Sequence, residues 1–152
     1  PLIYLGDELG LLNDYSYKED PGKVHDNRWV HRPSMVALQA PNGEFADIFN
    51  KMKRLIHIRK NEPVFSGTDL QVMNINNPHV LRFIRCTNDQ QALVIANFSE
   101  HPQFIIGDEF QSITKGTLYK NLQNNKEIML EDVQLKPYQL LLLRSVDETD
   151  DF

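Results

Sequence analysis

The sequence has a single cysteine, Cys86, so no disulfide can form within the chain. Cys86 stands among apolar residues, which favours a small core residue over a reactive thiol. No apolar run approaches the roughly 20 residues that a membrane-spanning helix needs, and no signal peptide opens the chain. The net charge of −5 argues against the basic face that nucleic-acid binding requires. We therefore expect a cytoplasmic protein with no nucleic-acid or membrane partner, unless a longer parent protein carries its own signal peptide.

The first ten residues, PLIYLGDELG, are the most informative part of the chain. Four apolar or aromatic residues run directly into Gly-Asp-Glu-x-Gly, a pattern that predicts a buried strand over residues 1–5 ending in a loop. A strand without alternation is covered on both faces and needs neighbours on both sides, yet nothing precedes this one. The pattern therefore predicts that the chain begins inside a larger domain.

An irregular segment and a helix follow. Residues 7–41 are rich in turn formers, which predicts a long loop with a short helical turn near residues 34–38. An apolar stripe then predicts an amphipathic helix that Pro63 ends and Asn42 could cap; the stripe consists of Phe45, Ile48, Phe49, Met52, Leu55 and Ile56. This helix needs a packing partner that the preceding residues do not supply.

From Pro63 onward the apolar period changes from 3.6 to 2, which predicts an antiparallel β domain. Turn residues separate the predicted strands, which span residues 70–75, 80–86, 92–98, 103–106, 116–121, 127–130 and 138–143. The aromatic residues of this part are scattered among apolar neighbours and are predicted to lie in the core; they are Phe65, Phe83, Phe98, Phe104, Phe110, Tyr119 and Tyr138. Residues 147–152 are predicted to form an acidic, solvated tail.

Several motifs, taken in order, resemble the α-amylase family of glycoside hydrolases, and within it amylosucrase and sucrose hydrolase. They are PLIYLGDELG, HDNRWVHRP, RLIHIRKNEPVF, ALVIANFSE and LKPYQLLLL. The resemblance implies a mainly β fold, an antiparallel β-sandwich preceded by the last β/α unit of a truncated (β/α)8 barrel. Residues 1–62 would be the last strand, loop and helix of the barrel, and residues 63–146 the C-terminal β domain.

The resemblance also implies that no catalytic residue lies in this chain. A retaining glycosidase needs two carboxyl groups about 5 Å apart, and the family takes them from barrel strands that would precede Pro1. Asp7 and Glu8 are not such a pair, since adjacent residues on a strand point to opposite sides. Glu8 is instead predicted to support its loop through hydrogen bonds. We expect no cofactor, and no metal at His25, Asp26 and His31, whose spacing fits no regular ligand pattern.

Arg28 is the residue that the resemblance assigns to the substrate. In sucrose-active members, an arginine of this loop pairs with an upstream aspartate and contacts the terminal glucosyl unit. A guanidinium suits that task because it grips a carboxylate at two points. A surface arginine is the alternative, and Arg32 could hold the role instead. Asp26 and Trp29 are predicted to support the loop, Trp29 as an apolar anchor more than as a sugar-stacking platform.

Two classes of function follow. The first is a C-terminal part of a retaining α-glucosyl transferase or hydrolase acting on sucrose or an α-glucan, inactive alone and partnered by its upstream barrel or by self-association. Trehalose synthase, sucrose isomerase and oligo-1,6-glucosidase are alternatives within the family. The second class is a non-catalytic sugar-binding or structural β module, which paired exposed aromatic residues would favour.

Overall fold

The computed structural model of the protein describes residues 2–32, 43–73, 76–88, 90–111, 114 and 116–146. The chain divides into two compact units, Pro1–His57 and Ile58–Phe152. Each unit is described by itself below. The predicted cap at Asn42, the helical turn at residues 34–38, the end of the strand at residues 74–75 and the acidic tail lie outside the described residues.

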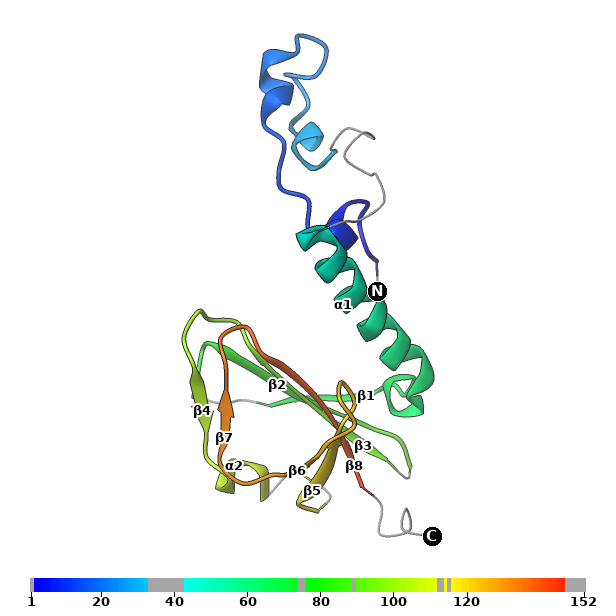
Figure 1. Ribbon diagram of the computed structural model, residues 1–152, viewed down its shortest axis with the longest axis vertical. Helices are drawn as coiled ribbons and strands as arrows, with labels where there is room; N and C mark the ends of the chain where they lie inside the picture. The colour runs from blue at the N-terminus through cyan, green and yellow to red at the C-terminus, as the bar shows by residue number, and fades with distance from the viewer. Residues whose placement is uncertain are drawn as a thin grey trace. The chain divides into compact units, whose positions relative to one another are not determined.

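The described part of the N-terminal unit consists of loops, three short 3₁₀ helices and most of one α-helix (Figure 1). The 3₁₀ helices are η1 (Asp7–Leu9), η2 (Ser16–Glu19) and η3 (Asn27–His31). Helix α1 (Glu44–Asn61) confirms the helix that the apolar stripe predicted. Part of this stripe is exposed, including Phe45, Ile48 and Ile56. Its apolar face is therefore only partly covered in the described structure.

The strand predicted over residues 1–5 is wrong for the described residues 2–5, which are extended or turn residues without a strand partner. Leu2, Ile3 and Leu5 are exposed. The Tyr4 backbone is used locally, since its N–H donates to the Asp7 carboxylate (3.2 Å) and its carbonyl accepts from the Asp7 N–H (3.0 Å). The physical reason is that a strand is stable only in a sheet, and none of the described strands pairs with residues 2–5.

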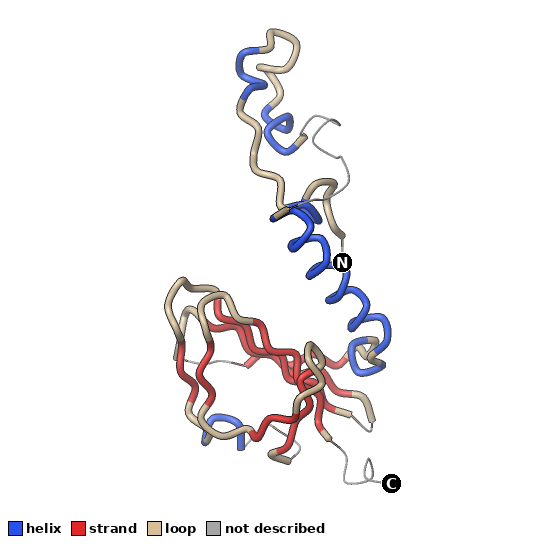
Figure 2. The backbone as a smooth tube through the Cα atoms, in the orientation of Figure 1, coloured by secondary structure: helices blue, strands red, loops and turns tan. Residues whose placement is uncertain are grey.

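The second unit is the antiparallel β domain that the period-2 pattern predicted (Figure 2). Its six-stranded sheet has the order β1-β2-β3-β8-β5-β6, and β4 pairs with β7 in a separate two-stranded sheet. The bounds are β1 (Asp69–Met73), β2 (Val80–Cys86), β3 (Gln91–Asn97), β4 (Gln103–Ile105), β5 (Leu118–Asn121), β6 (Glu127–Met129), β7 (Val133–Leu135) and β8 (Leu140–Ser145). The prediction missed β7 and the short helix α2 (Asp108–Gln111).

The core of the β domain lies between the two sheets. Its apolar side chains come from both sheets and from α2, whose Phe110 is 1% exposed. Tyr119 is fully buried and donates a hydrogen bond to the Gln91 side chain (2.5 Å). Arg82 also lies in this interior, 3% exposed, with its ion-pair partner Glu109 on α2. Two small sheets closed over one apolar core are a β-sandwich.

The sequence predicted that the aromatic residues of this domain lie in the core, but only some of them do. Phe65, Phe110 and Tyr119 are buried, but Phe98, Phe104 and Tyr138 are 65%, 58% and 69% exposed. Phe98 and Tyr138 lie just beyond the strand ends, where the sequence pattern does not tell which side is covered. Tyr138 also has a positive φ of 53°, an unusual conformation for a bulky residue, at the turn that leads into β8.

Candidate binding site in the N-terminal unit

A turn at residues 6–10 shapes one side of the candidate site. Gly6 and Gly10 have φ angles of 103° and 64°, which favour glycine, and the Glu8 carboxylate accepts a hydrogen bond from the Gly6 N–H (2.8 Å). A Cβ at Gly10 would lie 2.5 Å from Ile48 Cδ1, so the turn approaches α1 closely. The carboxylates of Asp7 and Glu8 therefore both accept hydrogen bonds from nearby backbone N–H groups, those of Tyr4 and Gly6. The Glu8 hydrogen bond has the form that a loop-supporting role requires, and that role stays a prediction.

Three aspartates shape the following loop in the same way. The side chains of Asp14, Asp20 and Asp26 each accept from the backbone N–H two residues on, at 2.9, 2.9 and 3.0 Å. Such Asx turns replace a backbone turn by a side-chain hydrogen bond. Hydrogen bonds favour the charged carboxylate and lower the pKa of all three groups below the ordinary value of 3.8. The donors, largest effect first, are the side chain and backbone of Ser16 at Asp14, the Gly22 backbone and the Lys23 side chain at Asp20, and the side chain and backbone of Arg28 at Asp26.

Asp26 and Arg28 form a two-point ion pair. Arg28 Nε donates to Asp26 Oδ1 (2.8 Å) and Nη2 donates to Oδ2 (2.9 Å). The pair raises the pKa of Arg28, whose side chain is 72% exposed. A guanidinium has five N–H donors, so donors remain for another group. The structure thus assigns Asp26 of this chain as a partner of Arg28, and pairing with an upstream aspartate stays a prediction.

Trp29 packs against two cations. Lys23 Nζ and Arg32 Cζ lie 5.1 and 5.4 Å from its ring centroid. The ring is half-buried and borders a small cavity of about 110 Å³ with Asp14, Asp20 and Tyr17. These contacts favour the anchoring role over a sugar platform, because the cations take up ring surface that a sugar would use.

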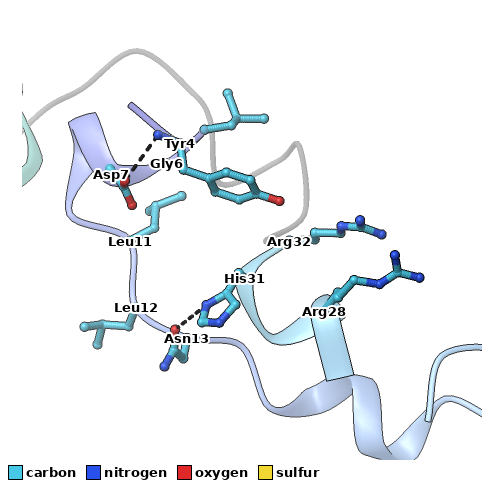
Figure 3. Close-up of a pocket in the computed structure, with 10 residues that line it drawn as sticks. Tyr4, Gly6, Asp7, Leu11, Leu12, Asn13, Arg28, His31 and Arg32 are labelled. Atoms are coloured by element: carbon cyan, nitrogen blue, oxygen red, sulfur yellow. Dashed lines mark hydrogen bonds between the residues drawn. The ribbon is translucent and has the colours of Figure 1, made fainter. Parts of the chain in front are cut away.

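Both candidate arginines border one cavity of about 490 Å³ (Figure 3). The side chains of Arg28 and Arg32 run in the same direction in Figure 3, and His31 Nδ1 lies 3.1 Å from Asn13 Oδ1. The lining residues are Tyr4, Leu5, Gly6, Asp7, Leu11, Leu12, Asn13, Arg28, His31 and Arg32. Arg28 also borders a second cavity of about 450 Å³, with Tyr15 and Tyr17.

Sequence reasoning found the two arginines but not Tyr4, Asp7, Asn13 or His31 as cavity residues. Asn13 and His31 are 18 positions apart, so no local pattern links them. Glu8 does not line the cavity, and Asp26 acts on it only through Arg28. Chemically, the cavity offers cationic and amide donors to a polar ligand. The carboxylate that lines the cavity, Asp7, accepts a hydrogen bond from the Tyr4 N–H.

Two searches within the described ranges bear on other sites. No group of three or more histidine, cysteine or acidic side chains there could hold a metal ion. None of the helices in those ranges has the length and apolar composition to cross a membrane.

Comparison with known proteins identifies relatives in the α-amylase family. The chain is 29% identical over 105 residues to oligo-1,6-glucosidase of Parageobacillus thermoglucosidasius, covering 68% of this chain and 18% of that protein. Among solved structures, a variant of AmyP in complex with maltotriose aligns with TM-score 0.60 and 14% identity over 68% of this chain and 21% of AmyP. A variant of the trehalulose synthase MutB in complex with glucose aligns with TM-score 0.52 and 18% identity over 64% of this chain and 18% of MutB.

The structural matches show a shared fold, an antiparallel β arrangement with few helices like that of the C-terminal domain of α-amylase-family enzymes. No family model matches the chain. The chain spans about a fifth of the length of these relatives.

Proposed function

We propose that this chain is the C-terminal part of a retaining α-glucosyl hydrolase or transferase that acts on an α-glucan or sucrose. The observation that carries the proposal is the 29% identity over 105 residues to oligo-1,6-glucosidase, joined with a fold shared with AmyP and MutB. The catalytic carboxylates would lie in the upstream part of the parent protein. This chain would supply one wall of the substrate pocket and a β domain.

Arg28 is the proposed substrate-contacting group of that wall. It borders the 490 Å³ cavity, and Asp26 fixes the orientation of its guanidinium by two hydrogen bonds. The remaining N–H donors suit sugar hydroxyls, which accept hydrogen bonds without carrying charge. Arg32 borders the same cavity and remains the second candidate, although its stacking on Trp29 also fits a role in holding the loop.

The substrate has two candidates within the family. The HDNRWVHRP segment supports the amylosucrase or sucrose hydrolase side, on which sucrose would be the substrate. The match to oligo-1,6-glucosidase supports a short α-glucan instead. Measuring kcat/KM for sucrose, isomaltose and maltotriose with a protein that joins this chain to its upstream catalytic part decides between them. Absence of activity on all three substrates would contradict the proposed function.

The same protein tests the role of Arg28. Arg28→Ala removes donors to the substrate and leaves Asp26 without its two-point partner. We expect kcat/KM to fall by roughly tenfold or more, because a hydrogen bond from a charged donor to the substrate is worth about that factor. Arg28→Lys should recover little, because an ammonium cannot reproduce the planar fork. Asp26→Asn should give a smaller fall, since it only loosens the guanidinium.

Lys18→Ala is the matched control, because Lys18 is an exposed cation of the same loop that stacks on Tyr15 and borders none of the three loop cavities. Its kcat/KM should be unchanged. A near-normal value for Arg28→Ala with a large loss for Arg32→Ala would transfer the role to Arg32. Near-normal values for both would make the loop structural.

A further inference from the structure

The second cavity of the N-terminal unit, of about 450 Å³, shares residues with the first cavity of about 490 Å³. It is lined by residues of η2, of η3 and of the segment before η2, and the two helices contact each other. The Asp14 N–H donates to the Val30 carbonyl (2.9 Å), which holds the two segments together. Asn13, Arg28 and His31 border both cavities, and the Asn13–His31 contact (3.1 Å) lies in this common wall (Figure 3). Two cavities with a common wall can hold neighbouring parts of one ligand.

The lining of the second cavity has the composition of a site for an uncharged polar ligand. Outside the common wall it consists of two tyrosines, an asparagine and one apolar side chain, which are Tyr15, Tyr17, Asn27 and Val30. Amide and phenol groups both donate and accept hydrogen bonds, as sugar hydroxyls do. Among the described residues, no carboxylate lines this cavity, and its arginine already pairs with Asp26. A charged ligand would therefore gain little here.

Tyr17 is the ring of this cavity that is best placed to carry a sugar. Its side chain is half-buried, so its neighbours restrict the positions of the ring. Tyr15 is 59% exposed, and Lys18 Nζ lies 5.4 Å from its ring centroid and occupies part of the ring surface. A ring that is already restricted loses less conformational freedom when a ligand packs on it. Tyr17 therefore offers a better binding surface than Tyr15.

We propose that the second cavity binds a further glucosyl unit of an α-glucan, with the sugar ring on Tyr17 and a sugar hydroxyl hydrogen-bonded to Asn27. This inference rests on the proposed function and deepens it, because it makes Tyr17 and Asn27 determinants of chain-length specificity. Both cavities have volumes within the range of about 300 to 1,000 Å³ that ligand pockets have. A single glucosyl unit fills only one of them, whereas an oligosaccharide gains contacts in both.

The test compares maltotriose with α-glucosyl fluoride in a protein that joins this chain to its upstream catalytic part. The fluoride carries a single glucosyl unit and a small leaving group, so it does not extend into the second cavity. Tyr17→Ala should lower kcat/KM for maltotriose by about tenfold, mainly through KM, and leave the value for the fluoride unchanged. Tyr17→Phe keeps the ring and should restore most of the loss. Asn27→Ala should lower kcat/KM for maltotriose by roughly two- to tenfold, the worth of a neutral hydrogen bond.

His25→Ala is the matched control, because His25 is an exposed ring of the same loop that borders none of the three loop cavities. Its kcat/KM should be unchanged for both substrates. A loss confined to maltotriose in Tyr17→Ala or in Asn27→Ala supports the subsite. Tyr17 also borders the small cavity beside Trp29, so its removal could loosen the loop. Equal losses on both substrates, or no loss on either, in both variants would therefore overturn the subsite.

A binding measurement separates this proposal from the proposed function. A maltotriose analogue with sulfur in place of its glycosidic oxygens resists hydrolysis, so calorimetric titration of the longer protein gives its affinity without turnover. Tyr17→Ala should weaken that affinity by about tenfold and leave the affinity for glucose unchanged. The same result in a protein that turns over no substrate refutes only the proposed function. An active protein in which Tyr17→Ala and Asn27→Ala bind the analogue as tightly as the unchanged protein refutes only the subsite.

Discussion

The buried pair Arg82–Glu109 leads to an unusual prediction about stability. Arg82 is 3% exposed, whereas the Glu109 side chain is 42% exposed, and Arg82 Nη2 lies 3.3 Å from Glu109 Oε2. Burial lowers the pKa of Arg82, an effect that Glu109 partly offsets. Arg82 Nε and Nη1 are buried without a hydrogen-bond partner in the part of the chain that the structure describes. Glu109→Ala is therefore expected to destabilise the domain more than Arg82→Met, although Arg82 is the buried residue.

The magnitudes follow from what each variant leaves behind. Among the described residues, Glu109→Ala leaves the buried guanidinium with the Phe110 ring, 5.3 Å away, as its remaining electrostatic partner. Breaking a buried ion pair in this way costs about 3 to 5 kcal/mol, and the partial exposure of Glu109 lowers our expectation to about 2 to 4. Arg82→Met removes the charge and its desolvation cost, fills much of the volume, and leaves Glu109 free to hydrate. We expect a change within about 1 kcal/mol of zero.

Thermal unfolding followed by far-ultraviolet circular dichroism measures the difference. For a domain of this size, about 1 kcal/mol shifts Tm by roughly 4 to 8 °C, so a loss of about 2 to 4 kcal/mol in Glu109→Ala should lower Tm by roughly 8 to 32 °C. The double variant Arg82→Met with Glu109→Ala should recover most of the loss, and Glu131→Ala, an exposed carboxylate of the same domain, serves as control. A larger loss for Arg82→Met than for Glu109→Ala would refute the reasoning.

Three further predictions concern the N-terminal unit and the chain as a whole. The 152-residue chain alone should release no glucose or fructose from sucrose, since the proposed function places the two carboxyl groups of a retaining glycosidase upstream of this chain. Release by pure protein above a blank would show that the active site is misplaced. The pKa values of Asp14, Asp20 and Asp26 are lowered, so the turns that these carboxylates form stabilise the loop fully above pH 3.8 and lose that contribution as the pH falls below 3.8. The fluorescence of Trp29, the sole tryptophan, should therefore change below pH 3.8 and not between pH 5 and 8. Gly10→Ala and Gly43→Ala share the left-handed cost of about 1 to 2 kcal/mol. A Cβ at Gly10 would meet Ile48, whereas a Cβ at Gly43 would have no atom of the described residues beyond its chain neighbours within 4 Å. Gly10→Ala should thus speed amide exchange in the first turns of α1 more than Gly43→Ala does, and Ile48→Val, which removes Cδ1, should reverse the excess.

The β domain was predictable where the local pattern and the fold agree. Residues 80–86 alternate and form β2 as predicted, and the apolar runs in β3 and β8 occupy the sheet centre because both of their faces are covered. Strand β7 was missed because it has only three residues between Asp132 and Lys136 and is stabilised by its pairing with β4. The strand at residues 1–5 was predicted because this run is apolar, but its described residues 2–5 pair with no described strand.

Only part of the candidate site could be predicted from the sequence, and the reason differs from that in the β domain. The resemblance singled out Arg28 and Arg32 by their motif, and the structure brings both to one cavity. The partner of Arg28 is Asp26, two residues away, which spacing alone does not reveal because an Asx turn folds the aspartate back onto the arginine. The contact between Asn13 and His31 depends on how the loop closes, and closure is set by three separate turns rather than by one local pattern.

The position of β8 in the sheet has a consequence for how the domain is made. β8 follows the other described strands in the chain, yet it lies between β3 and β5 and alone joins the β1-β2-β3 half of the sheet to the β5-β6 half. On a ribosome, β1, β2 and β3 can pair as successive neighbours, but the two halves stay separate until residues 140–145 have left the exit tunnel. The core contacts of Leu141 and Leu143 on β8 then form late, and those with β3 span a large sequence separation, which slows folding. During synthesis, the edge of β3 that β8 will occupy stays unpaired, and chaperones would have their longest opportunity to bind there.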